Sequence, residues 1–370
     1  MSKAAELAKA GETLTNQPSG RKNLVTNGAM QVAQRSTSTT GIGAADNNFP
    51  CVDRMKVRAG STAGRATVSQ VADGPSGFAN CLKFDCTTAD TSIAAGEYFL
   101  LQYGIEGQDL QQLKKGTSDA EKFTVSFYVK GNANATYTCE IKDQDNTRYI
   151  AQEFSVTSSW SKVSLTFNNE TSNSLDDDNA ESMRLTIWLH AGSTYTGGTF
   201  TSNTWFTTVN QRVGDNQTSF FDSTDREFFI TGVQMEIGSQ ATNFEHRSFG
   251  EEMLLCQRYF FIGCSSTDAH TGGMANGSFR TTSNAQVLQQ HPVAMRTNPT
   301  TALRASGSVV IHDTNDGNNI NVTAIDAVVN QSVKSTLFGL TLASASGVVG
   351  EGCWTYSAGG TPGITFDAEL

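Results

Sequence analysis

The sequence predicts an all-β protein. A jelly-roll-type β-sandwich is followed by a smaller C-terminal β-sandwich, and a short helix or anchor peptide precedes them. Apolar and polar residues alternate along many segments, which is the period of a half-buried antiparallel strand. Charged residues make up only 17% of the chain, and Gly, Ser, Thr and Asn separate the alternating segments, as is typical of strands joined by turns. Helical patterns are confined to a few short stretches.

The N-terminal residues 2–10 are good helix formers, with Ser2 placed to cap a helix and Gly11 placed to end it. A helix of this length is marginal in water unless it has a partner. Residues 16–22 have the composition of a linker. We therefore expect residues 1–22 to form an anchor peptide and linker, with a frayed terminus as the alternative.

The main domain is predicted from its alternating runs. In the first run, Phe123, Val125 and Phe127 point to one face, and residues 109–115 allow one helical turn before it. We assign residues 23–248 to a single two-sheet sandwich, near the upper size for one β domain. The runs lie at 123–130, 137–141, 160–167, 184–190 and 229–237.

The remainder of the chain has a different composition. Residues 249–261 are predicted to contain a linker helix that bridges two domains or forms the seam of an oligomer. In residues 262–370 Gly, Ala, Ser, Asn and Val dominate. The run 308–325 predicts two strands joined by an Asp-Gly turn. This smaller β domain has a weak core, which favours support from neighbouring copies.

Composition excludes several classes of protein. A net charge of −10 without any basic block argues against nucleic-acid binding. No run of 18 apolar residues is present, so no membrane insertion is expected, and the N-terminus lacks the apolar stretch of a secretory signal.

The seven cysteines are an odd number without a CxxC pair. They are therefore expected to be free, buried thiols of a protein assembled in a reducing cytoplasm.

Several ordered segments resemble a family of marine bacteriophage tail-fibre or minor structural proteins. They begin with NLVTNGAMQVAQR at 23–35 and end with HPVAMRTNPT at 291–300. The segments between lie at 105–110, 230–238, 241–248 and 256–259. The resemblance implies that the central domain is similar to the jelly-roll carbohydrate-binding modules of polysaccharide-degrading enzymes.

The same resemblance implies a pairing between the two ends of that domain. In such modules an N-L-x-x-N-G strand pairs with a final D-D-V strand, often with calcium between them. Residues 23–28 match the first pattern, but Thr231-Gly232-Val233 stands at the second. The aspartates of the calcium site are therefore missing here.

Aromatic side chains are the candidates for glycan contact, because an aromatic face covers the apolar face of a sugar ring. Tyr195 lies in a glycine-rich loop and Trp205 in a threonine-rich stretch, where recognition residues are often found. We predict these two as ligand-binding residues, with core packing or subunit contact as the alternative. Trp188 lies between Ile187 and Leu189 and is expected in the core.

Two acidic loops offer hard oxygen ligands of the kind that calcium prefers. They contain Asp143 and Asp145, and Asp176 and Asp178. The spacing of an EF-hand is absent. Solvated turns are therefore the default interpretation, and calcium is the alternative. No other cofactor is expected.

Catalysis has little support in the sequence. No HExxH, Gly-x-Ser-x-Gly or phosphate-binding glycine loop is present, and no pair of acidic residues stands out as a glycosidase pair. Glu245-His246-Arg247 is expected to be a hydrogen-bonded motif at the exit of the main domain rather than an acid–base pair. We therefore predict no catalytic residues and no enzyme.

Together these observations predict a structural component of a bacteriophage virion, assembled in the host cytoplasm. It would be a tail fibre or spike that recognises host-surface polysaccharide or lipopolysaccharide. We expect a homotrimer, because fibres close cyclic symmetry around an axis, and attachment to other virion proteins through the N-terminal segment. A capsid-attached head fibre or decoration protein is the alternative. A polysaccharide depolymerase is less favoured, because irregular strand spacing opposes a β-helix.

Overall fold

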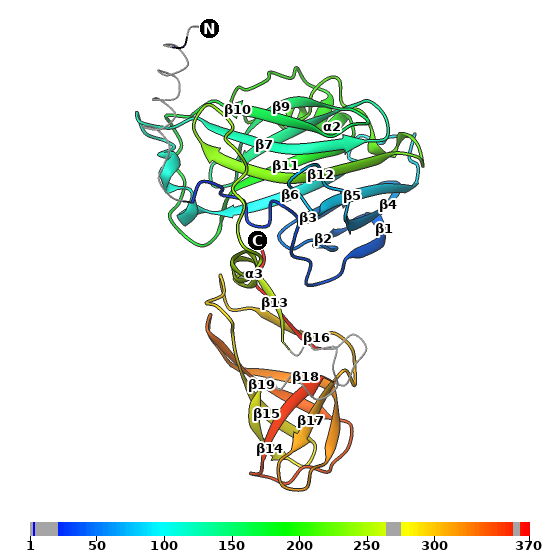
Figure 1. The fold of residues 1–370 in the computed structure, drawn as a ribbon, viewed down its shortest axis with the longest axis vertical. Helices are drawn as coiled ribbons and strands as arrows, with labels where there is room; N and C mark the ends of the chain where they lie inside the picture. Colours follow the sequence, from blue (N-terminus) through cyan, green and yellow to red (C-terminus); the bar gives the residue numbers. More distant parts are fainter. Residues whose placement is uncertain (1–2, 4–20, 264–274, 358–362) are drawn as a thin grey trace. The chain divides into compact units, whose positions relative to one another are not determined.

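The computed structural model describes Lys3 and residues 21–263, 275–357 and 363–370, which are mostly strands and loops (Figure 1). The chain divides into two compact units, residues 1–252 and 253–370. The helix expected in 249–261 is observed as α3 (Phe249–Gln257). The predicted helix at 2–10 lies, except for Lys3, outside the described residues.

The first unit contains two six-stranded antiparallel sheets, called sheet A and sheet B. Sheet A has the order β1 (Ser38–Ala44), β4 (Thr62–Val71), β5 (Cys81–Thr88), β12 (Glu227–Ile237), β7 (Phe123–Gly131) and β10 (Ser161–Phe167). Sheet B has the order β2 (Asn47–Asn48), β3 (Lys56–Gly60), β6 (Tyr98–Glu106), β11 (Glu181–Ala191), β8 (Ala135–Asp143) and β9 (Arg148–Val156).

The strand pairings of this unit are nested. β5 pairs with β12, β6 with β11, β7 with β10, and β8 with β9. Strands β5 to β8 thus pair in chain order with β12, β11, β10 and β9. A long hairpin with four strands in each arm gives these pairings when it curls into two facing sheets, and this is the jelly-roll arrangement. The predicted jelly-roll sandwich is therefore confirmed. The helical turn expected at 109–115 is observed as two short 3₁₀ helices, η1 (Gly107–Asp109) and η2 (Gln111–Leu113).

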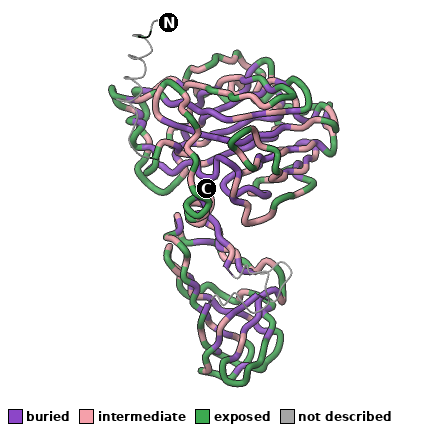
Figure 2. Tube along the Cα trace, viewed as in Figure 1, coloured by how far each residue is buried: buried purple, intermediate pink, exposed green. Residues whose placement is uncertain are grey.

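Side chains on the facing sides of the two sheets form the core. The predicted face of β7 is buried, with Phe123, Val125 and Phe127 at most 2% exposed. Figure 2 shows buried residues along the strands and exposed residues mainly in the loops. Burying one large apolar side chain stabilises the folded state by about 1.5–3 kcal/mol. The alternation of apolar residues therefore determines which face of each strand turns to the core.

The outer face of sheet B, which points away from this core, is also buried. Residues 212–218, in the segment between β11 and β12, lie across it. Val213 packs on Leu100 and Trp188 in a small second cluster, and the Gly214 N–H donates to Thr138 Oγ1 (3.1 Å). Trp188 is therefore buried, as predicted, but on the face opposite the main core.

The second unit is built around a closed barrel rather than the expected open sandwich. Its strands follow the order β14 (Asn276–Thr281), β15 (Asn284–Gln290), β19 (Ser335–Leu342), β18 (Asn319–Gln331), β17 (Val309–Asp313) and β20 (Gly352–Ser357). Closure through the β14–β20 pair removes the free sheet edges that a sandwich would leave. The predicted Asp-Gly hairpin joins β17 to β18, with Gly317 at φ +69°.

A small three-stranded sheet completes this unit, in the order β13 (Phe260–Gly263), β21 (Ile364–Asp367) and β16 (Thr300–Leu303). The six cysteines in the described part of the chain are free and buried, as predicted. Among the described residues, no helix has the length and apolar character needed to span a membrane.

Candidate functional site

Tyr195 belongs to a pair of tyrosines at one end of the outer face of sheet B. It lies in α2 (Ser193–Thr196), directly after β11. Its ring contacts Trp188 (centroid distance 5.0 Å) and meets Tyr98 edge to face (5.8 Å). Tyr98 begins β6, and both tyrosines are half-buried. Tyr195 is one of the residues predicted from the sequence to bind a ligand; Tyr98 is not, because a tyrosine at the start of a strand carries no distinguishing signal.

Two residues of β3 position the Tyr98 ring. A Cβ atom on Gly60 would lie 2.3 Å from Cε1 of Tyr98, so only glycine lets the ring lie against this strand. The guanidinium of Arg58 lies over the same ring, with Cζ 5.4 Å from its centroid. We call Tyr98, Tyr195 and Arg58 the tyrosine platform. It combines two aromatic rings, two hydroxyls and one guanidinium.

Arg212 holds the covering segment beneath this platform. Its Nε and Nη2 donate to the two carboxylate oxygens of Glu140, each at 2.6 Å. The guanidinium also lies over the rings of Tyr149 (4.4 Å) and Trp188 (4.8 Å). Burial lowers the pKa of Arg212, but the attraction of Glu140 outweighs it and raises the pKa. This charged, bidentate contact holds the segment around Arg212 on sheet B.

The hydroxyl of Tyr195 stays protonated at neutral pH. Burial and the neighbouring Tyr98 raise its pKa above 10.0, while Arg212 and Arg58 act in the opposite direction. The group can therefore both donate and accept a hydrogen bond at the platform.

Trp205 has different neighbours from Tyr195. Its Nε1 donates to the carbonyl of Asn168 (2.9 Å), and its ring packs partly buried against the main core. The ammonium of Lys115 lies 5.0 Å from the ring centroid. The structure thus does not bring the two predicted ligand-binding aromatics together, and the contacts of Trp205 are those of a packing residue.

Among the predicted calcium ligands, Asp143 already has a cation. Lys115 Nζ lies 2.5 Å from its carboxylate and 2.8 Å from that of Glu170. All three side chains are at most 5% exposed. Asn146 donates two further hydrogen bonds to Asp143. An internal ammonium thus holds the position that a metal ion would need.

The other predicted calcium ligands are exposed turn residues. Asp145 accepts a hydrogen bond from the Asp176 N–H (2.9 Å). Asp178 accepts one from the Ala180 N–H (2.9 Å). The Asp178 bond closes its own turn, as Asp side chains commonly do, whereas the Asp145 bond joins the two acidic loops. The four aspartates do not converge on one point.

The two ends of the first unit pair as the resemblance implied. The Leu24 N–H donates to the Met235 carbonyl, and the Val233 N–H donates to the Gly28 carbonyl, both at 2.9 Å. The Asn23 side chain donates to the carbonyl of Val233 (3.1 Å). These bonds join residues more than 200 positions apart and close the sandwich.

A guanidinium lies at this junction. Arg247 donates to the carbonyls of Asn23 (2.6 Å) and Val25 (3.2 Å) and contacts the carboxylates of Glu245 and Glu252, both at 3.3 Å. These oxygens are bound by the arginine, so the junction does not fit the calcium ion of the similar modules. Glu245 and Arg247 thus form the hydrogen-bonded motif predicted at the exit of the first unit, while His246 contacts the rings of Phe78 and Phe244.

A second group of rings lies on the outer face of sheet A. Phe78 contacts Tyr128 (5.2 Å), Phe244 (5.0 Å) and His246 (5.1 Å). The rings of this group pack on one another and hold two loops against the sheet. It therefore resembles a small core more than a platform for a ligand.

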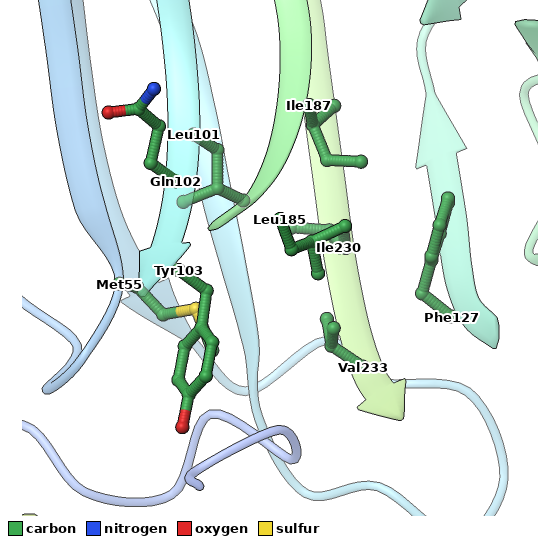
Figure 3. Close-up of a pocket in the computed structure, with 9 residues that line it drawn as sticks. All are labelled: Met55, Leu101, Gln102, Tyr103, Phe127, Leu185, Ile187, Ile230 and Val233. Atoms are coloured by element: carbon green, nitrogen blue, oxygen red, sulfur yellow. The ribbon is translucent and has the colours of Figure 1, made fainter. Parts of the chain in front are cut away.

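The cavity inside the sandwich is too small for a ligand. Figure 3 shows side chains of both sheets around it, with the Gln102 amide pointing away from the others. The space open to the centre of a water molecule is about 10 Å³, near the minimum for one water. It is lined by Met55, Leu101, Gln102, Tyr103, Phe127, Leu185, Ile187, Ile230 and Val233.

No protein-family model matches the chain, and no curated protein matches it. Solved structures that are similar in part include carbohydrate-binding modules. One, described as "CBM4 structure and function", has 13% identity and a TM-score of 0.31, covering 58% of this chain and 99% of its own. The TmCBM61 structure with β-1,4-galactotriose has 10% identity and a TM-score of 0.31, covering 59% and 100%.

The CBM22-1 xylan-binding domain of Paenibacillus barcinonensis Xyn10C has 13% identity and a TM-score of 0.28, covering 60% and 100%. These values are too low to transfer a ligand or a site. The jelly-roll assignment therefore rests on the strand pairings of the chain itself.

Proposed function

We propose that this chain is a non-enzymatic structural protein of a bacteriophage virion, a tail fibre or spike that binds host-surface glycans. The observation that carries the glycan part is the tyrosine platform. Its rings are partly exposed: Tyr98 begins β6 and lies against Gly60 of β3, and Tyr195 packs on Trp188 of β11. The virion part is supported by the resemblance of residues 23–300 to phage structural proteins.

The chemistry of the platform suits a sugar. A pyranose presents an apolar face that stacks on an aromatic ring, and hydroxyls that need donors and acceptors around it. Tyr98 and Tyr195 supply both kinds of group, and Arg58 adds charged donors. The rings are already fixed by Gly60 and Trp188, so little side-chain entropy is lost on binding.

The surroundings of the platform support binding without bond cleavage. Glycoside hydrolysis needs two carboxyl groups placed on either side of the scissile bond. Glu140, which connects to the platform through Arg212, is fully buried and bound at both carboxylate oxygens. It is therefore unable to act as an acid or base on a sugar.

Assembly into a homotrimer is part of this proposal. Val328 and Val329 on β18 and Leu288 on β15 are each more than 40% exposed. Exposed apolar side chains on a rigid barrel favour contact with neighbouring copies. Three copies would combine weak glycan contacts into useful avidity.

Two measurements test the proposal on the full-length protein. Isothermal titration with polysaccharide from the host surface should give saturable binding, and a reducing-end assay on the same mixture should stay at background. Sustained production of reducing ends would contradict the non-enzymatic role.

Immunogold labelling of virions should place the protein on the tail. Labelling of the capsid would favour the head-fibre alternative. Absence of the protein from purified particles would reject the virion role.

A further inference from the structure

Three ionisable side chains from distant parts of the sequence meet inside the first unit. Asp90 follows β5, Glu97 precedes β6, and His190 lies near the end of β11. One ligand atom from each lies within 4.8 Å of the other two. The residues are 6%, 5% and 0% exposed. Their separation along the chain explains why no motif revealed them.

The cluster carries negative charge that the described residues do not balance. Asp90 Oδ2 accepts hydrogen bonds from Thr62 Oγ1 (2.8 Å) and the Ala63 N–H (2.7 Å). Both donors favour the ionised form of this carboxylate. The Glu97 carboxylate contacts only His190 in the described part of the chain. Buried carboxylates without a cation are strongly disfavoured.

His190 by itself does not supply this cation. The His190 Nε2 atom is 3.3 Å from Glu97 Oε2. A charge-assisted hydrogen bond would be roughly 2.7–2.9 Å long. By contrast, two tetrahedral ligands each about 2.1 Å from a metal ion lie roughly 3.4 Å apart.

The other ring nitrogen is held as in known metal sites. His190 Nδ1 is 2.8 Å from Ser219 Oγ, which also accepts from the Phe221 N–H (3.1 Å). A proton on Nδ1 then leaves the Nε2 lone pair facing the carboxylates. Metal-binding histidines are usually oriented by such a bond on their second nitrogen.

We propose that Asp90, Glu97 and His190 bind one first-row divalent metal ion, with Zn²⁺ as the best match. One imidazole nitrogen and two carboxylate oxygens suit zinc or manganese, whereas calcium and magnesium prefer ligand sets made only of oxygen. The ion neutralises the buried carboxylates and ties the segment between β5 and β6 to β11. This site is independent of the proposed glycan binding.

The site also lies next to the tyrosine platform. Glu97 directly precedes Tyr98, and its carbonyl accepts a hydrogen bond from the Gly192 N–H (2.8 Å). The Thr194 N–H donates to the carbonyl of Ala95 (2.9 Å). Two of the three proposed ligands, Glu97 and His190, thus lie on the same short segments as Tyr98 and Tyr195.

The test uses untagged full-length protein, stripped with a chelator and then titrated with ZnCl₂. We expect one zinc per chain to remain after gel filtration, and zinc-edge X-ray absorption to show nitrogen and oxygen ligands without sulfur. Glu97→Gln and His190→Gln should each weaken binding at least about tenfold. The control is Glu236→Gln, which removes an equally buried carboxylate that accepts hydrogen bonds from Gln234 and Thr242. This variant should bind zinc with the affinity of the parent protein.

Absence of stoichiometric zinc in the parent protein, or sulfur ligation, would overturn the proposal. So would binding equal to the parent in both Glu97→Gln and His190→Gln. The spectrum of the parent decides the matter even where a variant fails to fold. Glycan titration of the same samples keeps the two proposals separate, because zinc binding is expected whether or not a glycan binds.

Discussion

Arg247 donates a 2.6 Å hydrogen bond to the main-chain oxygen of Asn23, 224 residues earlier in the sequence. The arginine side chain is 3% exposed and also contacts Glu252, whose carboxylate accepts a hydrogen bond from the Asn27 N–H (2.5 Å). Replacing Arg247 by an uncharged residue would leave the buried carboxylate of Glu252 without its cation. We predict that Arg247→Met lowers the free energy of unfolding of the first unit by about 3 kcal/mol, measured by urea titration with tryptophan fluorescence.

An exposed ion pair provides the control for this prediction. Lys114 contacts Glu121 at 3.0 Å, with side chains 52% and 43% exposed. Lys114→Met should change the free energy of unfolding by less than about 0.5 kcal/mol, because water screens such pairs. Equal effects of the two substitutions would show that Arg247 is not the buried cation of the junction.

Calcium should leave the stability of the protein unchanged. The ammonium of Lys115 already neutralises Asp143, and the oxygens around Arg247 are bound by its guanidinium. We expect the same melting temperature in millimolar CaCl₂ and in EGTA. The double variant Asp176→Asn, Asp178→Asn should respond identically. A calcium-dependent rise in the parent that this variant loses would restore the acidic loops as a metal site.

The second unit should lose stability in mild acid because of His291. Its ring bonds the Val333 carbonyl (3.0 Å) and Thr336 Oγ1 (2.9 Å). Burial lowers the pKa of His291 below 6.5, so the unfolded chain takes up a proton at a higher pH than the folded one. Stability should therefore be complete above pH 6.5 and fall as the pH drops towards the folded pKa.

Urea titrations that follow Trp354, the tryptophan of this unit, measure that dependence between pH 8 and pH 5. His291→Gln should flatten the curve over this window. A parent protein with constant stability across the same range would contradict the assignment of a neutral, buried His291.

The buried thiols should be unreactive in the folded protein. Burial raises the pKa of Cys51, Cys81, Cys86 and Cys353 to about 11, and only the thiolate attacks disulfide reagents. With Cys264, which lies outside the described residues, changed to serine, the native protein should react slowly with Ellman's reagent at pH 8. All six remaining thiols should react in guanidinium. Rapid reaction of the native variant would mean that these thiols are accessible.

Much of the first unit could be predicted from local patterns. The alternation around Phe123 and Phe127 assigned the right face of β7 to the core, because one side of sheet A is buried. Trp188 could not be assigned to a face in this way. Both faces of sheet B are buried, and the cover over Trp188 comes from Val213, which no period-2 pattern reveals.

Apart from the pairing between the two ends of the first unit, which the resemblance implied, the long-range pairings could not be predicted from the sequence. The hairpin at Gly317 follows from turn chemistry, but closure of the barrel depends on pairing Asn276 with Trp354, which no local pattern encodes. The platform illustrates the same limit. Tyr195 was found from its loop, whereas its neighbour Tyr98 is recognisable only once β6 and β11 are paired.

Binding of a glycan by Tyr98 and Tyr195 can be measured by titrating host polysaccharide into three proteins: the parent, the double variant Tyr98→Ala, Tyr195→Ala, and a Phe244→Ala control on the other sheet. Loss of two stacked aromatic contacts should weaken binding by roughly a hundredfold. The control should bind like the parent. Unchanged affinity in the double variant, with its melting temperature preserved, would show that the tyrosine platform is not the glycan site.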